Sequence, residues 1–499
     1  MARLRDEEQY RPVKLRASLF GREILSLRGL DINWPLFPPQ QSEASLFSSS
    51  GITRRSMLKL TALAAGSVAT SGVAGAWTDA NYSLEIAPYS LEVAPRRFIK
   101  TVAYNRQVPG PLLRLKENLP ITIDIANNTR NNEIVHWHGL FLPSEIDGSM
   151  EEGTPHIPPS GHAKYTFTPQ PAGFRWFHTH TMADKDMSKG LYSGQYGFLL
   201  VEPKDDPARY DREFFLELHD WNGQFLGVDD GAMDPVYDTS TINGKALGFG
   251  DPLRVKAGER VMMHLLNSSA TDLHWVALAG HNFHVVALDG NPVPQQRTIS
   301  MLRLAPAERV CAIVEMNNPG VWVLGEVRKH IQAAGMGIVV EYEGRHDKPQ
   351  WRQPQRLDWN YMQFVSPESA STRDISVIEI PLRIEAKFMG HGAPDRWMIN
   401  GRSFPDVESP LLKLGQRYRL IFDNRSQDDH PIHLHRHSFE LRRIADGPEL
   451  QGLVKDTVLV DSGKKTEVEF TANHSGPTLL HCHQQSHMDM GFMMVFKYA

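Results

Sequence analysis

Three stretches that share one pattern decide the fold: 104-YNRQVPGPLLRLKENLPITIDIANNT-129, 242-INGKALGFGDPLRVKAGERVMMHLLNSS-269 and 399-INGRSFPDVESPLLKLGQRYRLIFDNRS-426. Each reads as a turn with Asn, a Pro, an alternating apolar strand, a polar turn, and a second alternating strand that ends at Asn. Period-two alternation bounded by Gly, Pro and Asn predicts strands and hairpins. The sequence therefore predicts an all-β protein with three consecutive β-sandwich domains, at about 80–205, 206–345 and 374–499.

The composition is that of an ordinary soluble globular protein. Of 499 residues, 41% are hydrophobic and 22% charged, and the formal net charge is −5. This charge gives no reason to expect nucleic acid or an anionic membrane as a partner. The only cysteines, Cys311 and Cys482, allow at most one disulfide. We expect none, with Cys311 as a buried core thiol.

Residues 1–76 are predicted to be a leader. Paired Arg54 and Arg55 precede a small-residue apolar run that ends in the tripeptide Ala74-Gly75-Ala76. This pattern is typical of a twin-arginine export signal, so we expect a periplasmic or secreted protein. The apolar run is short and rich in Gly, Ser and Thr, which argues against a stable membrane span.

Histidines cluster in the first and third repeats but not in the second. At matched positions the first copy has HWH and HTH, and the third has HLH and HCH. The second copy offers only His274, in "LHWVAL", and later "GVWVLGEV", without histidine. The middle domain is therefore predicted to be a spacer, with any metal site between the first and third domains. The four pairs are His136/His138, His178/His180, His433/His435 and His481/His483.

Strand geometry sorts these ligands into two sets. Residues i and i+2 of a strand share a face, so each pair projects two imidazoles together, and eight suit a cluster of several ions. Cys482 faces the opposite side, His430 lies at an odd offset from His433, and His487 follows on a loop that can fold back. Two imidazoles and a thiolate form the blue-copper arrangement. A single zinc would leave seven histidines unused, and a nucleophilic thiol would not lie between metal-binding histidines.

The motifs "HWHG", "HTH", "HPIHLH" and "HCHQQSH", in this order, resemble those of the three-domain, laccase-like multicopper oxidases. The resemblance covers about Tyr82 to Ala499 and implies three cupredoxin-like Greek-key β-sandwiches that hold four copper ions. It implies these ligands: for type 1 copper His430, Cys482 and His487; for type 2 copper His136 and His433; for the type 3 pair His138, His178, His180, His435, His481 and His483.

The resemblance also implies roles for residues that do not bind copper. Phe492 stands at the axial position of type 1 copper, as a noncoordinating residue, with Met490 and Met493 as neighbours that a one-residue shift would bring closer. Asp147 matches a carboxylate near the trinuclear site and is predicted to relay protons, unless it only forms a turn before Gly148. Arg436 replaces a usual Gly for no reason visible in the sequence.

We expect an enzyme that couples one-electron oxidation of phenols or aromatic amines to the four-electron reduction of O₂ to water. The alternative is a Cu(I) or Fe(II) oxidase in copper tolerance, since Asp428 and Asp429 precede His430 and would attract cations. A noncatalytic cupredoxin scaffold is a third hypothesis, which the complete set of ten His and one Cys argues against. The expected partners are a small reducing substrate and O₂, and the expected state is a monomer.

Overall fold

The computed structural model describes residues 81–184, 186–204, 209–227, 233–354, 359–366, 376–387 and 396–499. The predicted leader, with Arg54 and Arg55, lies outside these residues, as do the predicted domain starts at 206 and 374. The described residues belong to one compact unit. No helix within the described ranges is long and apolar enough to cross a membrane.

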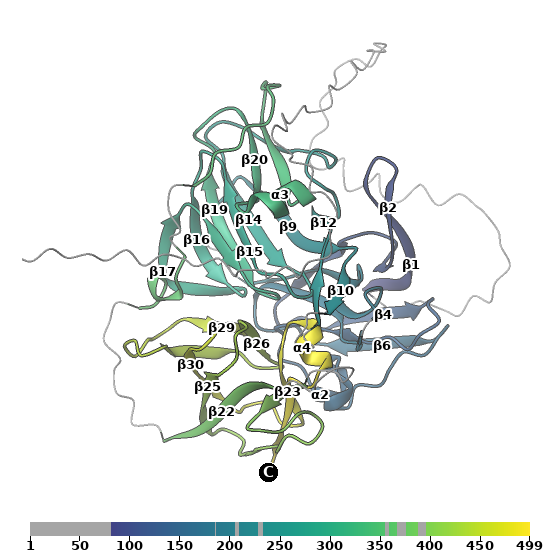
Figure 1. Ribbon diagram of the computed structural model, residues 1–499, viewed down its shortest axis with the longest axis vertical. Coiled ribbons are helices and arrows are strands. Elements are labelled where there is room, and N and C mark those ends of the chain that lie inside the picture. Colours follow the sequence, from purple (N-terminus) through teal and green to yellow (C-terminus); the bar gives the residue numbers. More distant parts are fainter. Residues whose placement is uncertain are drawn as a thin grey trace, which may run out of the picture. The chain divides into compact units, whose positions relative to one another are not determined.

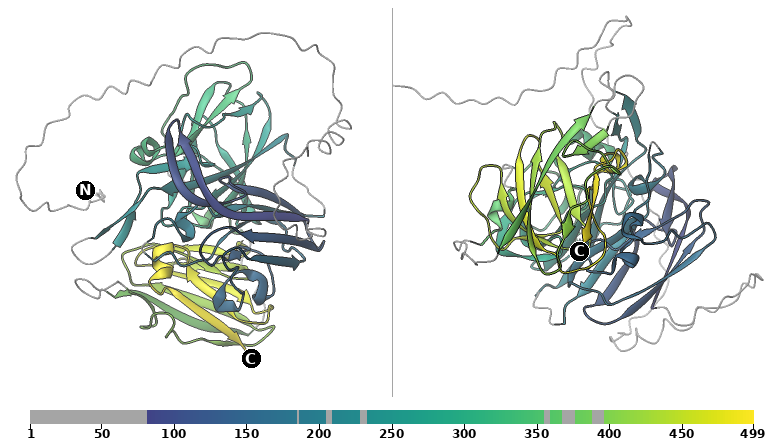
Figure 2. Two further views of the ribbon diagram at one scale, coloured as in Figure 1. Left: turned by 90° about the vertical axis from the view of Figure 1, so that its right-hand side faces the viewer. Right: turned by 90° about the horizontal axis from the view of Figure 1, so that it is seen from below.

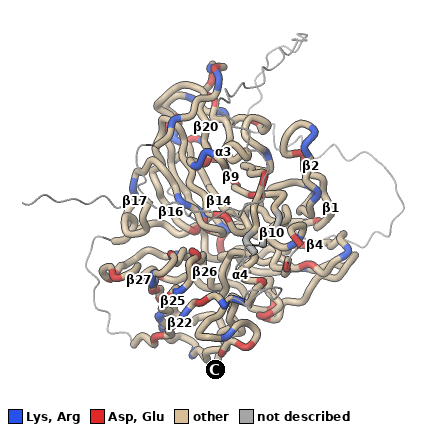
Figure 3. The backbone as a smooth tube through the Cα atoms, in the orientation of Figure 1, with Lys and Arg blue, Asp and Glu red and all other residues tan. Residues whose placement is uncertain are grey.

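The prediction of an all-β protein is confirmed. The described residues form six sheets of four to six strands and one two-stranded ribbon, and these sheets come in pairs along the chain. Figure 1 shows the pairs in sequence order, from purple and blue through teal to yellow. Lys and Arg are interspersed with Asp and Glu along the backbone in Figure 3, in keeping with the small net charge.

The first sandwich pairs a sheet of order β2-β1-β4-β6 with one of order β3-β8-β7-β5. Its short helices α2 and η1 follow β5, and η2 precedes β8. The elements are β1 (Tyr82–Ala94), β2 (Arg97–Tyr104), β3 (Gly110–Lys116), β4 (Ile121–Asn127), β5 (Val135–His136), α2 (Ser144–Asp147), η1 (Met150–Glu152), β6 (His162–Phe167), β7 (Gly173–Thr179), η2 (Gly190–Tyr192) and β8 (Tyr196–Glu202).

The second sandwich pairs sheets of order β12-β9-β14-β19-β16-β17 and β13-β21-β20-β15-β18. Its elements are β9 (Arg212–Trp221), β12 (Thr239–Ile242), β13 (Leu253–Val255), β14 (Arg260–Asn267), β15 (His274–Leu278), β16 (Phe283–Leu288), β17 (Asn291–Ile299), β18 (Leu302–Leu304), β19 (Arg309–Glu315), β20 (Val321–Glu326), α3 (Lys329–Ala334) and β21 (Gly337–Tyr342), with the ribbon of β10 (Gln224–Gly227) and β11 (Met233–Val236).

The third sandwich pairs sheets of order β23-β22-β25-β30-β27-β28 and β24-β32-β31-β26-β29. The short helix η3 (Tyr361–Gln363) precedes it. Its elements are β22 (Val377–Lys387), β23 (Arg396–Ile399), β24 (Leu411–Leu412), β25 (Arg417–Asn424), β26 (His430–Leu434), β27 (Phe439–Ile444), β28 (Val454–Lys455), β29 (Thr457–Val460), β30 (Lys465–Thr471), β31 (Thr478–Cys482), α4 (Gln485–Asp489) and β32 (Met493–Tyr498).

The repeated turn asparagine has the same structural role in all three sandwiches. Asn105, Asn243 and Asn400 have φ of 51°, 53° and 53°, in the left-handed region that Asn tolerates better than most residues. Each side chain accepts a backbone N–H and donates to a backbone carbonyl of the neighbouring strand; for Asn243 these belong to Glu217 and Phe215. The repeated Asn therefore fastens the turn to the sheet, which explains its recurrence.

The sandwiches pack on one another through apolar side chains. One buried cluster joins Phe174 and Trp176 of β7 to Leu266 of β14 and Ile313 of β19. Another runs from the second sandwich into the third. Figure 2 shows the yellow C-terminal strands beside the blue strands of the first sandwich, and α4 contacts η2 there. The first and third sandwiches thus share a boundary on which both histidine sets lie.

Candidate metal centres

The four H-x-H pairs lie on two matched pairs of neighbouring strands. His136 on β5 is opposite His178 on β7, and His433 on β26 is opposite His481 on β31. Across the boundary, His136 Nε2 lies 3.4 Å from His433 Nε2, and His180 Nε2 lies 3.4 Å from His481 Nε2. The structure therefore brings the eight imidazoles, predicted from two distant parts of the sequence, into one place.

Within this place the ligand atoms fall into groups of three. The nitrogens of each group lie within 4.8 Å of one another. Ligand atoms around a single metal ion lie at similar distances from one another, so each group could hold one ion. The eight imidazoles therefore suit several ions rather than one. The groups are His138/His178/His483, His180/His435/His481 and His136/His138/His433.

Hydrogen bonds to oxygen orient most of these rings. His136, His178, His433 and His481 each use Nδ1 to donate to a backbone carbonyl, at 2.7 to 2.9 Å. An imidazole that donates from Nδ1 keeps an unprotonated Nε2, and such outer partners fix the ligating tautomer. The backbone therefore aims the Nε2 lone pair of each ring.

The ring of His138 has the opposite orientation to these four. Its Nε2 donates to Asp456 Oδ1 at 3.1 Å, while its buried Nδ1 has no partner. His178 Nε2 and both ring nitrogens of His483 are likewise buried without a partner. Leaving such polar atoms unsatisfied costs about 1–3 kcal/mol each. These atoms belong to one of the three-histidine groups, so its donor set fits a metal ion that would satisfy them.

The electrostatics also suit metal ligands. Burial lowers the pKa of His138, His178 and His483 well below its usual value, and the neighbouring imidazoles lower it further. The same holds for His180, His433 and His481. Neutral imidazole is the form that binds metal. The cluster therefore disfavours protons and leaves its nitrogens free to coordinate.

Asp147 lies at the edge of the cluster, and the sequence missed its companion Glu152. His435 Nδ1 lies 2.9 Å from Asp147 Oδ2 and 3.0 Å from Glu152 Oε2. Burial opposes ionisation of Asp147, but His136 and His435 outweigh it and hold its pKa below the usual range. Burial and Asp147 raise the pKa of Glu152. The two buried carboxyl groups thus orient His435 together while Asp147 carries the charge.

The second centre consists of His430, Cys482 and His487. Cys482 Sγ lies 3.7 Å from His430 Nδ1 and 3.6 Å from His487 Nδ1, and the two Nδ1 atoms are 3.1 Å apart. Ser426 Oγ lies 2.9 Å from His430 Nε2 and fixes that ring. Cys482 is fully buried, and burial raises the pKa of its thiol. A thiolate at this place therefore needs a cation beside it, and the three donors fit a trigonal ion.

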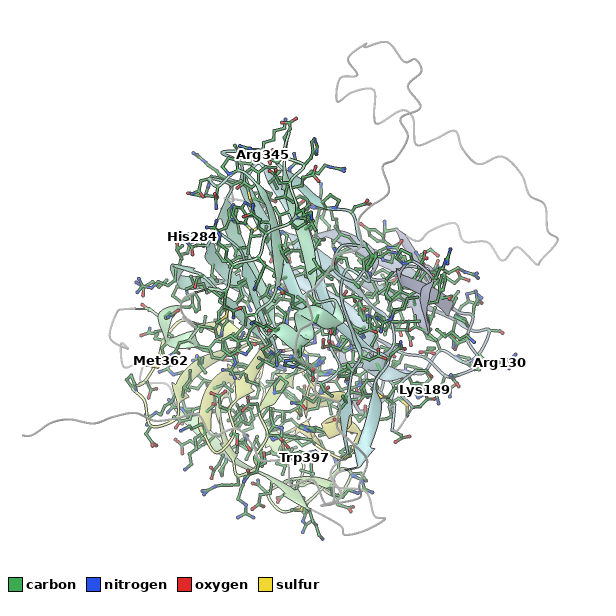
Figure 4. The ribbon with its side chains drawn as sticks, turned by 45° about the horizontal axis from the view of Figure 1, so that its top comes forward. Arg130, Lys189, His284, Arg345, Met362 and Trp397 are labelled. Carbon is green, nitrogen blue, oxygen red and sulfur yellow. The ribbon has the colours of Figure 1, made fainter. Side chains whose placement is uncertain are left out.

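Aromatic rings close this second centre. Trp397, labelled in Figure 4, has its ring centroid 4.2 Å from that of His487, and Phe492 has its centroid 4.9 Å from that of His430. Phe492 belongs to the same buried cluster as Cys482, whereas Met493 packs with Leu479 in a separate cluster. This placement favours Phe492 over Met493 as the residue that covers the axial side.

The structure explains Arg436. Its backbone has φ of 58°, in the region that favours glycine, yet its side chain is buried and fully engaged. The guanidinium donates to the carbonyls of Leu142, Ser475, Gly476 and Pro477 and to Thr478 Oγ1. The side chain therefore ties the loop after β5 to the turn before β31.

A buried network of charges supports the cluster from behind, and the sequence reasoning missed it. Asp456 accepts from Arg309 Nη1 at 2.7 Å and Nη2 at 2.5 Å, and Arg175 Nη1 lies 3.4 Å from it. All three side chains are fully buried. The sequence does carry a signal for this network. Two charged residues, Lys455 and Asp456, interrupt the apolar run "LVKDTVLV". Side chains from all three sandwiches thus contact one another at Asp456, the carboxylate that orients His138.

The structure also places both cysteines and, in the middle sandwich, His281 and His284. Cys311 and Cys482 are both free and buried, so the prediction of no disulfide is confirmed. His281 Nε2 lies 2.6 Å from the Tyr342 hydroxyl, and His284 lies between Thr298 and Gln296. Within the described ranges, every group of three or more metal-binding side chains comes from the third sandwich alone or from the first and third together, and none includes a residue of the middle sandwich.

Sequence comparisons identify the family. Three family profiles, each described as multicopper oxidase, match residues 90–206, 213–341 and 379–499. The chain belongs to the multicopper oxidase family. It is 28% identical over 428 residues to multicopper oxidase MmcO of Mycobacterium tuberculosis, covering 79% of this chain and 82% of that protein.

Solved structures show the same fold. Fet3p, a multicopper oxidase that functions in iron import, superposes on this multicopper oxidase with a TM-score of 0.74 at 17% identity, covering 84% of this chain and 90% of that one. A laccase from Botrytis aclada superposes with a TM-score of 0.71 at 19% identity, covering 83% and 87%. The predicted cupredoxin-like sandwiches are therefore confirmed.

As a multicopper oxidase, the protein is an oxidoreductase that binds copper and uses O₂ as electron acceptor. Copper held by the thiolate centre would supply one-electron steps, and copper held by the histidine cluster would supply the reduction of O₂. The chain itself contributes orientation, through carbonyls and carboxylates, and exclusion of water, through burial of the ligands, none of which is more than 9% exposed.

Proposed function

We propose that this multicopper oxidase oxidises phenols or aromatic amines rather than metal ions. The observation that carries the proposal is that the acids near His430 are paired with an arginine. Asp429 Oδ2 lies 3.5 Å and Asp461 Oδ1 2.8 Å from Arg303 Nη2, and Asp429 Oδ1 accepts the Ser462 N–H. A cation substrate would have to compete with this guanidinium for the two carboxylates, because the guanidinium offsets one of their two negative charges and so weakens their attraction for the cation.

The surface next to the thiolate centre suits an aromatic electron donor. Trp397 packs against His487, and no charged side chain of the described residues makes a hydrogen bond with that ring. Aromatic faces prefer offset or edge contacts with other rings. His487 and Trp397 expose only 5% and 6% of their surface, so we expect a flat organic reductant to dock over this side of the centre and to transfer its electron through His487 without entering the copper site.

The assignment of each ligand to a copper type is part of this proposal. His430, Cys482 and His487 would hold type 1 copper, and His136 and His433 type 2 copper. His138, His178 and His483 would hold one type 3 copper, and His180, His435 and His481 the other. The groups of nitrogens that lie together support this division. Proton transfer by Asp147 stays a prediction, supported by its contact with two of these histidines.

Oxygen uptake by the copper-loaded protein with a methoxyphenol, Cu(I) and Fe(II) in parallel tests the substrate class. We expect kcat/KM to be highest for the phenol. Arg303→Gln would free Asp429 and Asp461, so it should raise kcat/KM for Fe(II) and Cu(I) and leave the phenol unchanged. A wild-type preference for Cu(I) or Fe(II) over the phenol would overturn the substrate assignment and leave the oxidase function intact.

We also propose that the chain is exported through the twin-arginine pathway and acts as a monomer outside the cytoplasm. The paired Arg54 and Arg55 and the following apolar run support export. Replacing both arginines by lysine should keep the protein in the cytoplasmic fraction, and secretion of that variant would contradict the proposal. Sedimentation of the purified protein tests the monomer.

A further inference from the structure

The middle sandwich contains a cysteine and a histidine that face each other and belong to neither of the two candidate metal centres. Cys311 on β19 is the direct cross-strand partner of His264 on β14, and Sγ lies 3.3 Å from His264 Nδ1. Both side chains are about 95% buried, at 5% and 6% exposure. In the thiolate centre, His430 and His487 also turn Nδ1 toward the sulfur, at 3.6 to 3.7 Å. The middle sandwich thus repeats the sulfur–imidazole pairing of the third.

A carboxylate orients this second histidine as well. Glu213 on β9 places Oε2 3.3 Å from His264 Nε2. When Nε2 donates to a carboxylate, Nδ1 keeps its lone pair and the ring is held as a metal ligand. Asp456 orients His138 in the same way. Burial opposes a charge on His264, but Cys311 and Glu213 outweigh it and raise its pKa to about 9. Without a metal ion the ring therefore carries a proton on Nδ1, beside the sulfur, and a metal ion bound there would have to displace this proton.

We propose that Cys311 Sγ and His264 Nδ1 bind one Cu(I) ion in addition to the copper that the family requires. With metal–sulfur and metal–nitrogen bonds of about 2.3 and 2.0 Å, a 3.3 Å separation gives an angle of about 100° at the ion. That angle suits three or four ligands rather than two, so one or two positions remain for others. Thiolate and thioether sulfur select Cu(I) over harder ions.

The open positions face a cavity. Met262, His264 and Cys311 lie on one face of the sheet and line a cavity of about 940 Å³ between the first and second sandwiches. Met262 is two residues from His264 on β14 and offers a thioether on the same face. A small thiol that carries Cu(I) would fit the remaining space. The site is therefore expected to exchange copper with such carriers, unlike the closed centres of the third sandwich.

Charges around the cavity decide the form in which copper would enter. Arg114 is neutralised by Glu202 and Glu213. Lys204, Arg209 and Arg260 line the same cavity. Because these three cations repel bare Cu(I), delivery as a neutral or anionic thiol complex is expected.

Copper stoichiometry tests the site directly. The fully loaded enzyme, incubated without O₂ with excess Cu(I)–glutathione and desalted, should retain one more equivalent of copper than before. Cys311→Ser and His264→Gln should lose that equivalent and keep the blue band, which also reports that they fold. His284→Gln is the matched control, because His284 (Figure 4) lines the same cavity but hydrogen-bonds to Thr298 and Gln296. An unchanged copper content in the wild type, or retention of the extra equivalent by Cys311→Ser, would overturn the proposal.

A second measurement uses the wild-type enzyme alone. Iodoacetamide should alkylate Cys311 through the cavity, whereas copper protects Cys482, and one equivalent of Cu(I) should slow alkylation of Cys311 at least tenfold. Equal rates with and without Cu(I) would mean that the thiol is a nucleophile and not a copper ligand. Protection by Zn(II) but not by Cu(I) would contradict the assignment of the metal. If Cys311 resists alkylation in both conditions, the cavity does not reach the sulfur, and the exchange site is ruled out.

Discussion

The buried histidine of the middle sandwich, His274, has different surroundings from the buried histidines of the first and third sandwiches. His274, at the start of β15, has Nε2 2.8 Å from Asp220 Oδ2 and Nδ1 3.1 Å from Glu326 Oε2. Burial opposes protonation of His274, but the two carboxylates outweigh it and raise the pKa to about 10. In the cluster, by contrast, burial and neighbouring imidazoles lower the pKa of His433 and His481 well below its usual value.

This difference shows what a buried imidazole needs. Surrounded by carboxylates, it keeps both protons and becomes half of an ion pair. Surrounded by other imidazoles and by carbonyls, it stays neutral and presents a lone pair to a cation from outside the chain. The repeat can therefore keep a histidine at a matched position and lose the metal, when its neighbours change from imidazoles to acids.

Removing the thiolate should have the largest effect. Cys482→Ser takes away the soft donor of the three-ligand centre, so we expect complete loss of the blue thiolate-to-copper absorption and of O₂ uptake. Optical spectra and oxygen electrode traces measure this, with Cys311→Ser as the control that keeps both. A Cys482→Ser variant that stays blue would show that the assigned centre is wrong.

The ion pair of the middle sandwich can be broken by replacing its histidine, His274. His274→Gln leaves the buried Asp220 without its cation and Glu326 with Arg328 alone, which is expected to cost about 3–5 kcal/mol of unfolding free energy. Urea unfolding of the copper-free protein measures it. His284→Gln, at a half-buried position outside this ion pair, should change stability by less than about 0.5 kcal/mol. Reduced copper binding by folded His274→Gln would contradict a purely structural role.

The same histidine predicts how stability depends on pH. Its pKa is about 10 when folded and about 6.5 when unfolded, so its contribution is fully present below pH 6.5. As the pH rises from 6.5 to 10, the unfolded state releases this proton first, and up to about 5 kcal/mol should be lost. Unfolding free energies of the copper-free protein across this range test it. His274→Gln should show a flatter profile, and equal slopes would refute the pairing.

Changing the carboxylate behind His138 should have an intermediate effect. Asp456→Asn weakens the partner of His138 Nε2, and loss of such outer partners typically costs 10- to 100-fold in metal affinity or activity. Competition with a copper chelator, followed by the absorption of the type 3 pair, measures the loss. Asp461→Asn is the matched control on the same segment, because Asp461 pairs with Arg303 at the surface. Equal copper retention by the two variants would show that Asp456 does not orient the ligand.

The axial side of the thiolate centre should give the smallest shift. Phe492→Met would add a weak thioether donor that favours Cu(II) over Cu(I), so the type 1 potential should fall. We expect about 60 mV, which for one electron is a tenfold change in the redox equilibrium. Redox titration of the blue band measures it, with Met493→Leu as the control. An unchanged potential in Phe492→Met would mean that Phe492 does not lie on the axial side.

Much of the site followed from local rules of the chain. Alternation along a strand placed His481 and His483 on one face and Cys482 on the other, and the repeats indicated which sandwich lacks histidines. Those rules need only residue spacing. They did not reveal Glu152, Asp456 or Ser426, because each contacts its histidine through a loop or strand whose path the spacing of the motifs does not describe.

The sequence by itself determined the all-β fold, its threefold repetition and the sorting of ligands into two centres, because strand periodicity is a property of neighbouring residues. Only the tertiary structure decided which nitrogen each imidazole presents, why Arg436 is tolerated, and that Arg303 pairs with the acids near His430. The contacts of Arg436, Arg303 and His435 join residues that are 39 to 294 positions apart. Such contacts form only when distant parts of the chain pack together, and no local pattern encodes them.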